Sequence, residues 1–76
     1  MDLKEKIEVF GRYGVSLNKI AEQASMARTT LNRYIQGIGV AVETPQRIND
    51  ALKSIAIELY NTAFAEENEA AEEWEE

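Results

Sequence analysis

Residues 16–37, SLNKIAEQASMARTTLNRYIQG, decide how this chain folds. The apolar residues of this stretch fall into two groups of different helical phase. They are Ile20, Ala21 and Ala24 in the first group, and Leu31, Tyr34 and Ile35 in the second. Because an amphipathic helix repeats its apolar positions every three or four residues, the break at Ser25 predicts a turn. We therefore expect two short helices that meet at a sharp angle, with a small residue, Ala21, where they touch.

The residues before this stretch predict one further helix. Residues 2–13 carry apolar side chains at helical spacing, with Asp2 placed to cap the helix and Gly14 placed to end it. Ser16 is a favoured capping residue for the next helix, which we expect to run to about Ala24.

The residues after the turn predict two more helices and a loop. The third helix should span about 28–36, since Gly37 is a natural residue to follow a helix end. Residues 37–43, GIGVAVE, are expected to form a loop, with a strand that pairs across a dimer as the alternative. Thr44 is a favoured N-cap, and the proline after it is tolerated at the first helical position, so a fourth helix should span about 45–64.

The composition excludes most kinds of chemistry. A chain of 76 residues is expected to form one domain with a small core. It contains no Cys and no His, so it lacks disulfides, thiolate nucleophiles, the common zinc ligands and the usual general base. No glycine-rich phosphate loop occurs either. We expect a protein that is not an enzyme, with no cofactor and no metal site.

The net charge of −6 comes from one end of the chain. Residues 66–76, EENEAAEEWEE, contain seven Glu and no Lys or Arg. Residues 1–65 contain the other seven acids and all eight Lys and Arg, which sum to +1. Like charges three and four residues apart weaken a helix, so we expect a frayed or disordered acidic tail after a domain at 1–65. Any basic surface on that domain must be local.

The layout of residues 16–37 resembles the helix-turn-helix of the Cro and lambda-repressor-like families of phage and bacterial regulators. One helix before the pair and a proline-started helix after it also look like that superfamily. The chain departs from the family at Ser25, where Gly is usual, and at Ala27, where Ser or Thr is common. The resemblance implies an all-α, four-helix domain that binds double-stranded DNA. It also implies a cytoplasmic protein of a bacterial cell, and the small size favours one that a phage encodes.

The resemblance implies which residues would contact DNA. The third helix would lie in the major groove with its N-terminal residues at base edges, and the start of the second helix would contact the backbone. The implied contact residues are Asn18, Lys19, Ala27, Arg28, Thr29, Thr30, Asn32 and Arg33. Within this set Arg28 suits guanine and Asn32 suits adenine, because each can form two hydrogen bonds to that base. Arg33 and Thr30 are placed to reach phosphates.

The fourth helix is longer than three short helices can cover, which suggests a second copy as partner. A homodimer would also read two half-sites, as regulators of this kind usually do. The candidate dimer residues are Ile55, Ile57, Leu59 and Phe64. No apolar run approaches the roughly 20 residues that cross a bilayer, so we expect no membrane association.

Two other functions fit the same residues. The chain could be an antirepressor or inhibitor that binds protein through the helix-turn-helix surface, or through a tail whose carboxylates imitate phosphates. It could also be the DNA-binding subunit of a phage recombination or packaging complex. In a combined form, the acidic tail could fold over the basic helix and compete with DNA, which would weaken non-specific binding most.

Overall fold

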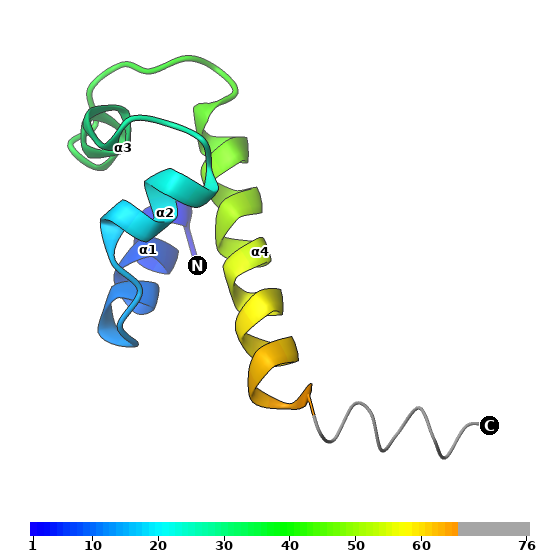
Figure 1. Ribbon diagram of the computed structural model, residues 1–76. Coiled ribbons are helices and arrows are strands. Elements are labelled where there is room, and N and C mark those ends of the chain that lie inside the picture. The colour runs from blue at the N-terminus through cyan, green and yellow to red at the C-terminus, as the bar shows by residue number, and fades with distance from the viewer. Residues whose placement is uncertain (66–76) are drawn as a thin grey trace.

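Four helices follow one another in the computed structural model, which describes residues 1–65 (Figure 1). They are α1 (Leu3–Arg12), α2 (Leu17–Gln23), α3 (Arg28–Ile35) and α4 (Thr44–Ala63). The expected all-α fold with a long last helix is confirmed, and residues 37–43 belong to a loop as expected. The expectation of a frayed tail concerns residues 66–76, which lie outside the described residues.

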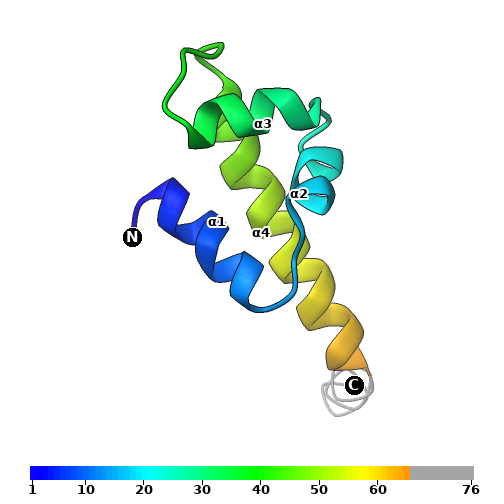
Figure 2. The same ribbon diagram turned by 90° about the vertical axis from the view of Figure 1, so that its left-hand side faces the viewer.

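The helices pack around the first half of α4. Both α1 and α2 contact α4, and α2 also contacts α3, which crosses the end of the domain (Figures 1 and 2). The apolar stripes of the four helices meet in one core. Its buried members are Ile7, Ile20, Ala21, Leu31, Ile48, Leu52 and Ile55. Burial of one such Ile or Leu side chain contributes about 1.5–3 kcal/mol, so this small core carries most of the stability.

Three of the four helices end in the same hydrogen-bond pattern, the Schellman motif, which needs a left-handed residue just after the helix. Gly14 and Gly37 fill that position after α1 and α3, with φ of 91° and 78°. Ser25 fills it after α2, with φ of 55°. The defining bonds join Val15 N–H to Phe10 O at 3.0 Å, Met26 N–H to Ala21 O at 3.0 Å, and Ile38 N–H to Arg33 O at 2.9 Å. The turn that the sequence predicts at Ser25 is therefore made by a residue that is strained there.

The first two helices are capped at their N-terminal ends and the third is not, as the sequence predicts. Asp2 and Ser16 cap α1 and α2, and their side chains accept bonds from Glu5 N–H at 2.9 Å and Lys19 N–H at 3.1 Å. Ala27 precedes α3 and gives no side-chain cap. The first amide groups of α3 are thus left without a capping side chain, as the sequence predicts.

The start of α4 differs from its sequence-based prediction. Thr44 is already inside the helix and is buried, and the capping position is Glu43, which has helical backbone angles and no capping bond. The reason is a tight turn just before the helix, in which Thr44 N–H bonds to Ala41 O at 3.0 Å. The chain therefore enters the helix one residue earlier than expected, and it leaves at Ala63.

Candidate nucleic-acid interface

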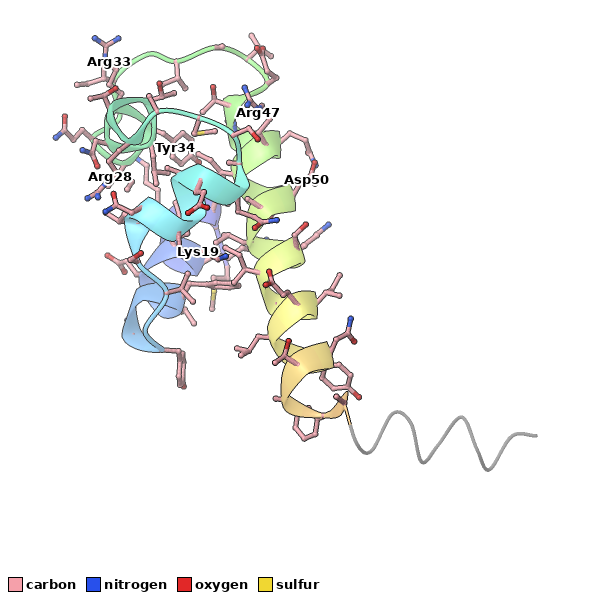
Figure 3. The ribbon with its side chains drawn as sticks, in the orientation of Figure 1. Lys19, Arg28, Arg33, Tyr34, Arg47 and Asp50 are labelled. Atoms are coloured by element: carbon pink, nitrogen blue, oxygen red, sulfur yellow. The ribbon has the colours of Figure 1, made fainter. Side chains whose placement is uncertain are left out.

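The helix pair α2–α3 presents one face of α3 to solvent. Figure 1 shows α3 end-on while α2 runs across the view, so the two helices cross steeply. Ala21 of α2 and Leu31 of α3 are buried, which fixes the inner face of the pair. Arg28 and Arg33 are both exposed and point away from α4 in Figure 3, on different sides of α3 because they are five residues apart. The outer face of α3 is thus free to meet a partner.

Arg28 is held by two asparagines. Its Nη1 donates to Asn18 Oδ1 at 2.6 Å, and its Nε donates to Asn32 Oδ1 at 3.2 Å. Asn18 lies in the first turn of α2, whereas Arg28 and Asn32 lie one turn apart on α3. Three of the residues that the resemblance implies for DNA contact therefore form one hydrogen-bonded group across the two helices. We call it the Asn18–Arg28–Asn32 clamp.

The other predicted contact residues lie in three places. Thr29 is exposed beside Arg28 at the start of α3. Ala27, Thr30 and Arg33 border an open hollow between the turn, α3 and the loop before α4. Lys19 lies elsewhere, because it lines a hollow formed by the start of α2 and the second half of α4. Seven of the eight residues thus lie near α3, and Lys19 lies on a different side.

Arg47 supports the turn between α2 and α3, and sequence reasoning missed it. Its Nη2 donates to Ala24 O at 2.8 Å and to Ser25 O at 2.6 Å. These carbonyls follow the last turn of α2, where helices leave acceptors unpaired and where a positive charge is favourable. Arg47 thereby ties α4 to the turn. No sequence signal reveals this contact, since the residues are 22 and 23 positions apart.

The charges of α3 itself are positive, and Glu43 is the acidic residue that lines the same hollow as Thr30 and Arg33. No Asp or Glu occurs between residues 23 and 42, and α3 itself carries two arginines. Lys4 of α1 adds a third cation beside Tyr34 of α3, since its Nζ lies 5.9 Å from the centre of the Tyr34 ring. A domain whose net charge is near zero therefore still has a locally basic end. Tyr34 is half-buried against the core and lies under this cation.

An apolar groove lies at the other end of the domain, between α1 and the second half of α4. It is lined mainly by aromatic and aliphatic side chains from both helices, and its volume is about 530 Å³. Its lining includes Val9, Phe10, Tyr13, Leu59, Tyr60 and Phe64. We call this surface the α1–α4 groove. A contiguous apolar surface of this kind is a candidate docking site.

The four candidate dimer residues do not share one surface. Leu59 and Phe64 line the α1–α4 groove, and 61% and 42% of their surface is exposed. Ile55 also borders the groove, but it is buried and belongs to the core. Ile57 is 61% exposed and does not line the groove. Sequence reasoning missed the part of the groove that Phe10 and Tyr13 supply, because it considered α4 alone.

The described part of the chain contains no cluster of acidic residues suited to a metal ion. None of its helices is both long enough and apolar enough to cross a membrane. Comparison with known protein families, curated proteins and solved structures gives no significant match. Residues 1–65 form a small all-α domain of four helices.

Proposed function

We propose that this chain is a small sequence-specific DNA-binding regulator of the helix-turn-helix type, with α3 as the reading helix. The observation that carries the proposal is the outer face of α3. The exposed side of this helix carries Arg28, Thr29 and Arg33, the helix crosses its neighbour steeply, and residues 23–42 contain no Asp or Glu. An α-helix of this kind fits the major groove, where each base pair shows a distinct set of donors and acceptors.

The supports of α3 agree with this role. A reading helix must be held rigidly, because recognition depends on placing donors within hydrogen-bond distance of base edges. Leu31 anchors α3 in the core, and Arg47 holds the turn that sets its direction. Asn18 at the start of α2 lies beside Arg28 and bonds to it. Lys19 is left out of this contact set because it lines a hollow against α4.

The α1–α4 groove supports a dimer as the DNA-binding form. One reading helix contacts only a few base pairs, so two copies that read half-sites about 34 Å apart give the usual affinity and specificity. The groove lies toward the far end of α4 from α3, so pairing through it leaves the reading face open (Figure 2). Lys53 and Glu58 are the only charged residues of α4 after Asp50 and have opposite signs, so this half of α4 adds no net charge to the interface.

The proposal is tested by fluorescence anisotropy with labelled duplex DNA at several salt concentrations. The probes are the region upstream of the gene that encodes the chain and a random duplex of equal length. We expect the upstream duplex to bind tightly, with an affinity that falls steeply as salt rises, because bound cations displace counterions from phosphates. Arg33→Ala should weaken binding to every duplex and reduce the salt slope by about one. The matched control is Arg12→Ala, which removes a cation from the end of α1 and should leave binding unchanged.

The acidic tail supplies a second arm of the same experiment. A chain that ends at Ala65 lacks seven Glu, and we expect it to bind random duplex more tightly than the full chain does. Absence of binding by both chains to any duplex at low salt would contradict the DNA-binding proposal. In that case the antirepressor or inhibitor function would become the better proposal, and the acidic tail would be its first candidate surface. Binding to random duplex alone would instead favour a subunit of a DNA-processing complex.

A further inference from the structure

We infer that Asn18 and Asn32 are positioning residues that hold Arg28 for one guanine, and that neither asparagine reads a base itself. This inference rests on the proposed function, since it assigns the chemistry of the same face. It changes the contact that the resemblance implies for Asn32, which was adenine. It also changes the role of Asn18, from a phosphate contact to a support for the reading side chain.

The hydrogen bonds of the clamp leave Arg28 able to read a base. A guanidinium has five N–H donors in a fixed plane, and the clamp uses two of them. Three donors remain, and a bidentate contact to O6 and N7 of guanine needs only two. The side chain is exposed, so without the clamp it would lose considerable conformational freedom on binding. The two asparagines restrict the Arg28 side chain in the free protein, so less conformational freedom is lost when DNA binds.

The same bonds disfavour adenine as a target of Asn32. An asparagine reads adenine with its carbonyl oxygen on N6 and its amide nitrogen on N7, so both ends must face the base. Here Asn32 Oδ1 accepts from Arg28 Nε, and the residue is half-buried one turn along α3. Asn32 Oδ1 has a second lone pair, so a contact with adenine would require one orientation of the amide to satisfy both Arg28 and the base. The geometry therefore favours one guanine contact over a guanine and an adenine contact together.

The experiment starts with selection of binding sequences by the full-length chain from a duplex pool with 20 randomised base pairs. We expect one guanine position per half-site to be strongly preferred, by roughly ten- to a hundred-fold over other bases. Arg28→Ala should abolish that preference. Asn18→Ala and Asn32→Ala should each reduce the same preference, and no A·T position should lose its preference in Asn32→Ala.

Two substitutions separate positioning from direct readout. Asn32→Asp keeps an oxygen that accepts from Arg28 but loses the amide that adenine N7 requires. We expect it to retain the guanine preference while binding every duplex more weakly, because the added charge repels phosphates. Asn18→Asp adds the same charge at the other end of the clamp and serves as the matched control. Arg33→Ala should lower affinity without changing base preference.

A double-mutant cycle decides whether the asparagines act through Arg28. In the Arg28→Ala background, Asn32→Ala and Asn18→Ala should change affinity less than two-fold, since there is no side chain left to hold. An equal loss from Asn32→Ala in both backgrounds, centred on an A·T pair, would overturn the inference and leave the proposed function intact. If the chain selects no sequence at all, the proposed function fails and the inference fails with it.

A second measurement tests the clamp without DNA. The side-chain Nε–H signal of Arg28 can be followed by nitrogen-15 NMR in the free protein. We expect its chemical shift to change in Asn32→Ala but not in Thr29→Ala, which alters an exposed neighbour. An Nε–H signal that is the same in all three proteins would overturn the clamp itself, whatever the DNA experiments give.

Discussion

The two halves of α4 have similar apolar spacing but different surroundings. In the first half Ile48, Ala51, Leu52 and Ile55 are buried against the other helices. In the second half every residue from position 56 onward is exposed, although Leu59 and Tyr60 continue the apolar pattern. The apolar pattern therefore predicts where the helix runs. Which of its apolar residues become buried depends on how far α1 and α2 extend along it. The first half packs in the core with the other three helices, and we propose that the second half contacts another copy.

The largest expected effect of a substitution is in the first half of α4. Leu52 is 2% exposed and lies in the core, so Leu52→Ala should lower the free energy of unfolding by about 2–5 kcal/mol. In so small a domain such a loss could leave little folded protein at room temperature. Urea denaturation followed by circular dichroism measures it. Leu59→Ala is the matched change in the second half. If it lowered the free energy of unfolding as much as Leu52→Ala does, the two halves of α4 would not differ in the way described.

A smaller effect is expected where the first half of α4 meets the turn. Arg47→Ala removes two hydrogen bonds to the carbonyls of Ala24 and Ser25, which should lower the free energy of unfolding by about 1–2 kcal/mol. The exposure of Arg47 to solvent keeps this loss small. The melting temperature should then fall by about 4–16 °C. Lys53→Ala, an exposed cation further along the same helix, is the control and should change the melting temperature by much less. Equal effects of the two substitutions would show that Arg47 does not support the turn.

Gly14 and Ser25 have left-handed backbone angles just after α1 and α2, and substitutions at the two positions should change stability in opposite directions. Ser25→Gly should stabilise the domain by about 0.5–1 kcal/mol, because glycine adopts a positive φ without the strain that Ser25 carries. Gly14→Ala should destabilise it by about 1 kcal/mol, and the added carbon meets no atom within 4 Å, so only the backbone is tested. Thermal unfolding of both variants checks the pair. A destabilising Ser25→Gly would mean that the serine side chain supports the turn.

The smallest effect on stability, with the clearest effect on assembly, is expected in the second half of α4. Leu59→Gln should change the free energy of unfolding of the monomer by less than about 0.5 kcal/mol, since the side chain is exposed. It should also convert the dimer to a monomer in sedimentation velocity. Ile57→Gln is a close control, because Ile57 is equally exposed, at 61%, and lies outside the α1–α4 groove. Loss of the dimer in Ile57→Gln alone would move the interface to the other side of α4.

Local signals in the sequence predicted most of the fold. Asp2 and Ser16 cap helices as expected, Gly14 and Gly37 end them, and Ser25 adopts the left-handed backbone that the family pattern implies. These features depend on neighbours within a few residues, which a sequence shows directly. The start of α4 was the exception, since the turn before Thr44 replaced the expected cap.

The arrangement of the candidate site could be predicted only in part. The residues around Arg28 were identified, but not that Asn18 and Asn32 bond to it from two helices. Arg47 was missed because its partners lie far away in sequence. Lys19 was included for its charge at the start of the second helix, and it lines a hollow against the second half of α4. Contacts between helices depend on the packing of the whole domain, which residue spacing does not specify.

The most direct test of the central claim, that α3 meets DNA while the second half of α4 does not, is an amide NMR titration of the full chain with a selected duplex. We predict that signals of Asn18 and of residues 27–33 shift most, with smaller shifts around Arg47, and that signals of residues 56–63 stay where they are in the free dimer. Shifts concentrated in residues 56–63, with α3 unchanged, would contradict the account.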